Sequence, residues 1–356
     1  MAPIRVLVCD DDVAVRRMIA EMVDRDPDLE VCGIAGDGAD VVRKVEALQP
    51  DIATLAVEMP VMGGLEILRN LRTVRPSLPV VMVSALTPEG SGAALDALSL
   101  GAADCVGSPL EADRLDAELI PRLKALVPGK ARPVPGVVFG GGPGSRTDEA
   151  FGARTTQIDA LLIASSTGGP VALESVFGAL RGPLPVPTLV VQHIPPVFSE
   201  MLAARLDQVG PTRFVHAEAG MTLEPGTAYL APGGRHLTVQ RDGAEVVLGT
   251  NEGPRVNGCR PAADVLFESA ESVWGGNLLC AVLTGMGHDG AEGARRLADL
   301  GASVIAQDQG SSVVHGMPRA VAATGAVNEM VALDELPSRL ETWLTRHGRR
   351  PVSSLG

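Results

Sequence analysis

The sequence is poor in basic, aromatic and cysteine residues, and each shortage excludes a class of function. Its 356 residues hold 30 Lys and Arg against 43 Asp and Glu, which gives a formal net charge of -13. Nucleic-acid binding depends on basic surfaces that release counterions from phosphates, so no nucleic-acid partner is expected. Two Trp, one Tyr and six Phe residues are too few for the aromatic platforms on which single strands stack.

Cysteine pairs, export signals and long apolar runs are also missing. The five cysteines are widely spaced and include no Cys-x-x-Cys pair, which favours buried free thiols over a redox or zinc site. The N-terminal residues Met1–Arg5 lead straight into a strand-like run, without the charged and apolar segments of an export signal. No run of about 18 apolar residues could cross a bilayer. We therefore expect a cytoplasmic protein that is not embedded in a membrane.

Length and pattern predict two domains joined by a linker, because one hydrophobic core rarely organises a chain this long. Residues 1–126 alternate short β-branched runs with amphipathic stretches, the pattern of a flavodoxin-like α/β domain. Residues 127–156 are rich in Pro and Gly and predict a linker. Residues 157–348 return to alternating strands and helices, and residues 349–356 are expected to form a polar tail.

Both domains are predicted to be built on mainly parallel sheets. The strands expected in the first domain are Ile4–Cys9, Glu30–Ala35, Ile52–Leu55, Val80–Ser84 and Asp104–Val106, with helices that begin near Val13, Gly38, Gly64, Ser91 and Asp113. The strands expected in the second are Ile158–Ala164, Thr188–Val191, Asn277–Leu283 and Ser303–Ala306. This second domain is predicted to be doubly wound, with a β-rich insert between Arg213 and Leu248, where turn signals are frequent.

Three adjacent carboxylates, Asp10, Asp11 and Asp12, follow the first predicted strand. Ligands collect at this edge of open α/β sheets, and adjacent carboxylates suit a hard cation. An alternative is that one of them caps the next helix while the others face solvent. Composition alone favours that alternative.

The first domain resembles a response-regulator receiver domain. The resemblance is carried by the runs Val6–Asp11, Thr54–Pro60, Val81–Ser84 and Gly107–Pro109, in that order. It implies the flavodoxin-like fold and a phosphorylation site at the carboxyl edge of the sheet.

Individual positions of that site are altered here. The resemblance implies that Asp10 and Asp11 match the family's acidic metal-site pair and that Ser84 matches its hydroxyl residue. Ala56 stands where the family has its phospho-accepting aspartate, and alanine has no oxygen to attack a phosphoryl group. Ser108 replaces the lysine that pairs with the phosphate. We therefore predict a degenerate receiver that binds magnesium weakly and acts as a docking or gating surface without its own phosphorylation.

Three strand ends of the second domain carry a nucleophile, a base and an acid. The turn Ser165–Pro170 places hydroxyls at a helix N-terminus, where amides favour a phosphate or an oxyanion. His193 ends the next strand, and Asp289 starts a helix after a glycine-rich turn. Each has a structural alternative, a helix cap for the hydroxyls or Asp289 and a structural role for the histidine. Their convergence on one edge of the sheet favours a Ser, His, Asp constellation.

From Ile158 to the C-terminus the chain resembles the catalytic domain of chemotaxis protein-glutamate methylesterases. Besides the three strand ends, the resemblance is carried by Gly253–Asn257, Arg260–Phe267 and His315–Arg319, although the family often has an aromatic residue where His315 stands. The pocket wall is therefore expected to differ at this position.

The resemblance also assigns roles. It implies that Ser166 is the nucleophile, His193 the general base and Asp289 the acid that orients the base, and that the Met286 backbone amide stabilises the oxyanion. The implied reaction is hydrolysis of glutamyl methyl esters on cytoplasmic helical segments of methyl-accepting chemoreceptors, with no metal or organic cofactor. Deamidation of receptor glutamines and contact with a chemotaxis histidine kinase are implied as well. The alternative is a catalytically silent scaffold that binds receptors or kinases.

Overall fold

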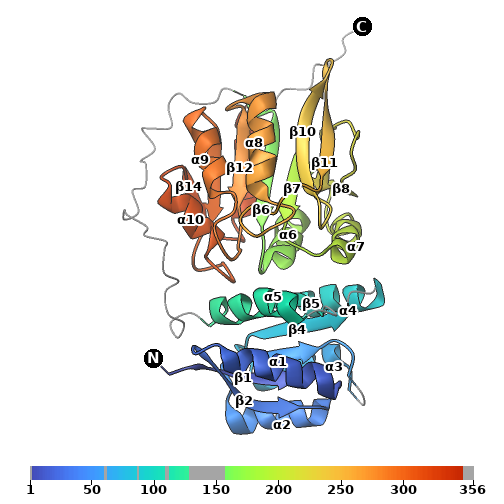
Figure 1. Ribbon diagram of the computed structural model, residues 1–356. Helices are drawn as coiled ribbons and strands as arrows, with labels where there is room; N and C mark the ends of the chain where they lie inside the picture. Colours follow the sequence, from blue (N-terminus) through green and yellow to red (C-terminus); the bar gives the residue numbers. More distant parts are fainter. Residues whose placement is uncertain (1, 60–61, 86–87, 109–111, 128–156, 348–356) are drawn as a thin grey trace. The chain divides into compact units, whose positions relative to one another are not determined.

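The structure of the protein is a computed structural model that describes residues 2–59, 62–85, 88–108, 112–127 and 157–347 (Figure 1). The chain divides into two compact units, residues 1–138 and 139–356, and each is described by itself. The division falls within the predicted linker. Residues 128–156 of that linker, the predicted tail and the side chain of Ser108 lie outside the described part, so the domain boundaries stay a prediction.

The first unit is a five-stranded parallel sheet with strand order β2-β1-β3-β4-β5. Its strands are β1 (Ile4–Cys9), β2 (Leu29–Ala35), β3 (Ile52–Ala56), β4 (Val80–Ala85) and β5 (Asp104–Ser108). Its helices are α1 (Val13–Arg25), α2 (Gly38–Leu48), α3 (Gly64–Val74), α4 (Pro88–Ser99) and α5 (Ala112–Ala125). Helix α1 packs beside α5, whereas α2, α3 and α4 form a second group (Figure 1). This is the predicted flavodoxin-like order.

The strand order of the first unit reverses between β1 and β3, so the carboxyl ends of these two strands border the crevice where such sheets bind ligands. Asp10 follows β1 and is buried, and Ala56 ends β3. Asp12 caps α1, because its Oδ1 accepts hydrogen bonds from the backbone N–H groups of Ala14 at 2.7 Å and Val15 at 3.1 Å. The capping alternative is therefore confirmed for Asp12.

The second unit is built on a seven-stranded sheet with order β14-β13-β12-β6-β7-β9-β8, and every pairing in it is parallel. The strands are β6 (Ala160–Ser165), β7 (Thr188–Gln192), β8 (Arg213–His216), β9 (Thr227–Leu230), β12 (Leu278–Val282), β13 (Ser303–Gln307) and β14 (Glu329–Val331). The helices are α6 (Gly169–Gly178), α7 (Pro196–Leu206), α8 (Ala263–Trp274), α9 (Ala291–Asp299), α10 (Met317–Ala323) and α11 (Leu336–His347).

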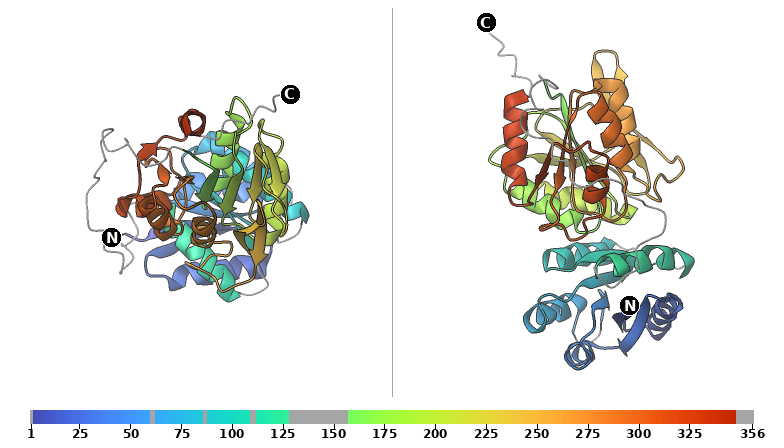
Figure 2. Two further views of the ribbon diagram at one scale, coloured as in Figure 1. Left: turned by 90° about the horizontal axis from the view of Figure 1, so that it is seen from above. Right: turned by 90° about the vertical axis from the view of Figure 1, so that its left-hand side faces the viewer.

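Helices cover both faces of this sheet (Figure 2). Helix α6 packs against α7 and α11, while α9 packs between α8 and α10. All residues of the central strands β6, β7 and β12 are buried, which explains why these runs are apolar without alternation. From β6 the chain moves to β7 on one side and later returns to β12 on the other. The crevice at this reversal is therefore bordered by the loops after β6 and β12.

The predicted β-rich segment is present, but its strands divide between two sheets. β8 and β9 extend the main sheet in parallel, and only β10 (His236–Asp242) and β11 (Glu245–Asn251) form a separate antiparallel hairpin. The three-residue strand β14 was not predicted, because a run this short carries no periodic signal.

Candidate active site

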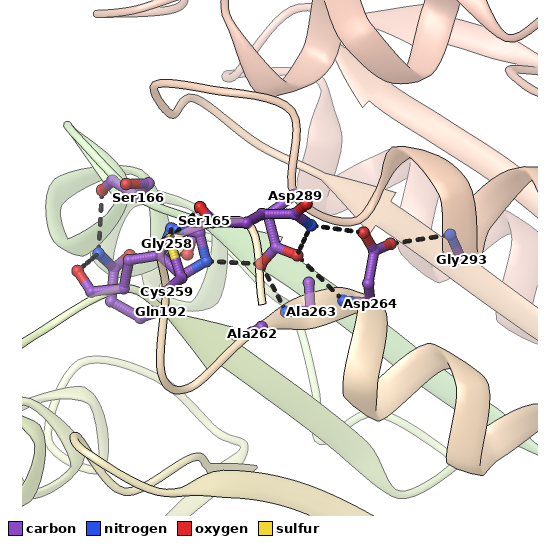
Figure 3. Close-up of polar contacts among 12 residues, drawn as sticks. Ser165, Ser166, Gln192, Gly258, Cys259, Ala262, Ala263, Asp264, Asp289 and Gly293 are labelled. Carbon is purple, nitrogen blue, oxygen red and sulfur yellow. Dashed lines mark hydrogen bonds and ion pairs between the residues drawn. The ribbon is translucent and has the colours of Figure 1, made fainter. Parts of the chain in front are cut away.

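Ser165 ends the first strand of the second unit and Ser166 follows it, and the two serines have different surroundings (Figure 3). Ser165 is fully buried, and its hydroxyl donates to Gln192 Oε1 at 2.7 Å. Ser166 is 8% exposed, and within the described part of the chain no hydrogen bond engages its Oγ. The turn continues through Gly168, whose φ of +78° suits glycine, into α6. Of the two hydroxyls, Ser166 is the one left available for chemistry.

Gln192 ties the serine turn to the neighbouring strand end. Its Nε2 donates to the carbonyl oxygens of Ser166 at 2.9 Å and His193 at 3.0 Å, and the His193 N–H donates to Ser165 O at 3.0 Å. A Cβ on Gly169 would lie 1.9 Å from Gln192 Oε1, so only glycine fits there. Gln192 is not among the residues predicted from the sequence. Side-chain alternation was the available signal, because Ser165 and Gln192 are register partners on adjacent strands.

His193 and Asp289 form a buried pair. His193 follows β7, and its Nε2 lies 2.7 Å from Asp289 Oδ2, with the side chains 8% and 2% exposed. Burial alone would lower the pKa of His193, but the hydrogen bond with Asp289 and the contact with Cys259 raise it from 6.5 to about 9. Burial likewise disfavours the charged form of Asp289, yet the hydrogen bonds it accepts hold its pKa below 3.8. Both shifts favour an ion pair.

Asp289 also caps a helix. Its Oδ2 accepts a hydrogen bond from the Ala263 N–H at 2.6 Å, and its Oδ1 accepts from the Asp264 N–H at 3.2 Å, both in the first turn of α8. Asp264 in turn accepts from the Gly293 N–H of α9 at 2.8 Å (Figure 3). Asn257 donates to Asp289 Oδ1 at 2.9 Å. The predicted alternative, a cap on the helix that follows Asp289, is wrong, because Gly290 is the N-cap of α9 and the Asp289 carboxylate instead accepts from amides of α8.

Ser166 lies beside His193 without bonding to it. The two residues directly follow the register pair Ser165 and Gln192, and adjacent strands lie about 5 Å apart. Among the described residues, no hydrogen bond joins Ser166 Oγ to the imidazole; its Nδ1 instead faces Cys259 Sγ at 3.5 Å. The structure thus pairs the predicted base with the predicted acid and leaves the contact with the predicted nucleophile unmade. Such contacts often tighten only when substrate binds.

The loop after β12 closes over the serine turn. Thr284 O accepts the Ser166 N–H at 3.0 Å, and a Cβ on Gly285 would lie 2.8 Å from Ser166 Cβ. The next residue is Met286, whose backbone N–H has no acceptor within the described ranges. An unpaired amide beside the serine is what an oxyanion donor requires, although the role of Met286 stays a prediction.

Two other histidines have structural partners. His216 Nε2 lies 3.0 Å from Ser199 Oγ, and His236 Nε2 lies 2.9 Å from Pro254 O. His315 has a buried Nε2 without a partner among the described residues, and burial lowers its pKa. The described residues include no cluster of three or more His, Cys, Asp or Glu placed to hold a metal. They also include no helix with the length and apolar character needed to cross a membrane.

Comparison with known proteins points to one family. The CheB methylesterase family model matches residues 161–340, and the response regulator receiver domain model matches residues 6–120. A protein-glutamate methylesterase/protein-glutamine glutaminase from Nocardioides sp. is 43% identical over 97% of both chains. Relatives with the same name from Symbiobacterium thermophilum and, numbered 1, from Caulobacter vibrioides are 40% and 41% identical, each over 94% of this chain and 95% and 96% of their own.

A solved structure supports the fold of the second unit. The crystal structure of the Thermotoga maritima CheB methylesterase catalytic domain is 34% identical, with a TM-score of 0.51, and the match covers 52% of this chain and 99% of that one.

Proposed function

Because the chain belongs to the CheB methylesterase family, we propose that Ser166, His193 and Asp289 together hydrolyse glutamyl methyl esters in its second domain. The family and the α/β fold class are as predicted, with a receiver domain ahead of a methylesterase domain. The enzyme class is therefore protein-glutamate methylesterase. The relatives are also named protein-glutamine glutaminases, and an amide passes through the same tetrahedral geometry, so we extend the proposal to glutamine deamidation.

The buried His193–Asp289 pair next to an unengaged serine hydroxyl carries the proposal. Asp289 accepts the Nε2–H of His193 and leaves Nδ1 to take a proton. Ser166 gives its proton to Nδ1 as its oxygen attacks the γ-carbonyl of the ester, and the Met286 N–H stabilises the oxyanion. The imidazolium returns the proton to the leaving methanol. Water then cleaves the acyl-enzyme with His193 again as base. Every step uses groups of the protein and water, without a cofactor.

The proposed substrates are cytoplasmic helical segments of methyl-accepting chemoreceptors, which would place the enzyme in the cytoplasm. A chemotaxis histidine kinase is the second proposed partner, through the receiver domain. The acidic net charge of -13 supports the expectation that nucleic acid is not a partner.

The test compares two adjacent serines by methanol release from receptor-containing membranes with labelled methyl esters. Ser166→Ala is expected to lose about 10^4-fold or more of the activity, because it removes the nucleophile. Ser165→Ala removes only the buried hydrogen bond to Gln192 and is expected to stay within about tenfold of the native rate. Equal release by the native protein and Ser166→Ala would refute the proposal. Background release by all three would favour a silent scaffold.

A further inference from the structure

A tight turn lies against the His193–Asp289 pair. Val256 and Cys259 exchange two backbone hydrogen bonds, Val256 N–H to Cys259 O at 3.1 Å and Cys259 N–H to Val256 O at 2.8 Å. The two residues between them, Asn257 and Gly258, have φ angles of +53° and +77°. Positive φ at both central positions is the geometry that Asn-Gly pairs adopt in two-residue hairpin turns. Local sequence therefore fixes the shape of this turn.

Each end of the turn contacts a different member of the pair. Asn257 Nδ2 donates to Asp289 Oδ1 at 2.9 Å and to Asp264 Oδ2 at 2.7 Å. Cys259 Sγ lies 3.5 Å from His193 Nδ1. Asp289 and Cys259 are the titratable groups that hydrogen-bond His193 in the described part of the chain.

The Asn257 amide lies between two carboxylates that repel one another. Asp264 is half-buried, and burial together with the charge of Asp289 raises its pKa. A neutral donor shared by both carboxylates offsets that repulsion and fixes the rotation of Asp289, so that Oδ2 points at the imidazole. The thiol at the other end of the turn holds the ring nitrogen that has to receive the serine proton. The two contacts together determine the tilt of the ring and the direction of its Nδ1 atom.

We propose that the Val256–Cys259 turn positions the general base, with Asn257 orienting Asp289 and Cys259 orienting His193. This inference rests on the proposed esterase function. Asn257 touches no reacting atom and acts through Asp289. Cys259 contacts Nδ1, the atom that takes the serine proton, but it forms and breaks no bond, so both residues are assigned a positioning role. A purely structural turn would stabilise the fold without influencing the protonation of His193.

The first variant, Asn257→Gly, removes the amide and keeps the turn, since glycine accepts a positive φ. Loss of a hydrogen bond to a charged group predicts a fall in kcat of about tenfold to a hundredfold, with KM within about twofold. Asn257→Asp is expected to lose more, because it presents a third carboxylate to Asp264 and Asp289.

The second comparison concerns the thiol. Cys259→Ala removes a contact that favours the protonated imidazole, so the midpoint of the pH–rate profile should move towards acid. Cys259→Ser keeps a group that can accept a hydrogen bond from the protonated Nδ1, and it is expected to restore most of that midpoint. Arg255→Ala is the matched control, because Arg255 is exposed and bonds only Gly258 O of the turn, at 3.1 Å. An effect of Arg255→Ala as large as that of Asn257→Gly would reduce the turn to a structural role.

The protonation of His193 can also be measured without turnover. The titration of His193 is followed by NMR with labelled histidine in Ser166→Ala, with and without Asn257→Gly or Cys259→Ala. An acid shift of the His193 midpoint in both added variants supports the proposal, and an unchanged midpoint overturns it whatever the methanol assay gives. Failure of the esterase proposal would be recognised separately, by methanol release that persists in Ser166→Ala.

Discussion

Two buried aspartates, one in each unit, follow strands that border the reversal of strand order, and they have opposite surroundings. Among the described residues Asp10 accepts one hydrogen bond, from the Asp12 N–H at 2.9 Å. Burial raises the pKa of Asp10 from 3.8 to about 6. Asp289 is as buried, but His193, two helix amides and Asn257 donate to it, and its pKa is lowered. Donors around a carboxylate therefore matter more than its depth.

The same contrast extends to the two sheet edges. Both units are parallel α/β sheets whose strand order reverses at a central strand. In the first, Ala56 stands where the resemblance to receiver domains predicts the phospho-accepting aspartate, whereas the second has the proposed catalytic residues Ser166, His193 and Asp289. A fold thus does not determine which side chains stand at its functional edge.

The largest effect is expected from Asp289→Asn. The amide cannot hold the imidazole in the required tautomer, so esterase activity should fall by about 10^4-fold. Asp264→Asn is the control, because Asp264 caps α9 without contacting His193, and it should stay within about tenfold. Methanol release measures both. Similar losses in the two variants would show that helix capping, rather than the histidine partner, explains the effect.

The first unit is expected not to be phosphorylated by small phosphodonors. Incubation of the native protein with acetyl phosphate and Mg²⁺ should give no stable acyl phosphate in residues 1–126, since Ala56 offers no carboxylate. Ala56→Asp restores the acceptor and should be labelled above background, as measured by intact-protein mass spectrometry. The esterase rate of the native protein should not change with the phosphodonor. Phosphorylation of the native protein in residues 1–126 would contradict the prediction that only the second unit keeps its chemistry.

The pH dependence of the esterase should reflect the raised pKa of His193. The base must be neutral to accept the serine proton, so kcat/KM should rise by about tenfold per pH unit below a midpoint well above 6.5. A rate that is already level at pH 6 would contradict this. Stability should change in the opposite direction. The folded state favours protonated His193, so its contribution is complete below pH 6.5 and is lost as pH rises towards about 9.

The smallest effect is expected from Asp10→Asn. Because folding raises the pKa of Asp10, the buried charge costs stability, and that cost develops as pH rises from 3.8 through about 6. At neutral pH the variant should be more stable by about 1–2 kcal/mol, since an amide oxygen still accepts from Asp12. Thermal unfolding at pH 4 and pH 8 measures the difference. The exposed Asp11→Asn is the control and should leave the unfolding temperature unchanged.

Much of the fold could be predicted because the central strands are buried on both faces. Such strands are continuous apolar runs, and β1, β6 and β12 were all recognised from them. Which sheet β8 and β9 join was not predictable, since the sequence of a short strand does not indicate its pairing partner. Their pairing depends on the position of β7, which is a property of the assembled core.

Residue types at strand ends predicted a Ser, His, Asp constellation with His193 and Asp289, and the family resemblance chose Ser166 among the hydroxyls of the turn. Gln192, Asn257 and Cys259 could not be chosen in this way, because their importance comes from contacts between segments distant in sequence. Asn257 had one local signal, the Asn-Gly pair of a tight turn. That signal predicts a turn without predicting which carboxylate it meets.

The carboxylate of Asp289 caps the N-terminus of α8, and this affects which substitutions the chain can accumulate during evolution. A residue without a side-chain acceptor would leave the Ala263 and Asp264 amides without this partner, and loss of such a cap costs about 1–2 kcal/mol. Mutations that silence the enzyme there therefore also weaken the folded domain, and selection for foldability alone would oppose them. The side chain at position 56 has no comparable structural role, because β3 is held by backbone pairing with β4. Substitution at position 56 therefore costs little folding stability, whereas substitution of Asp289 lowers it.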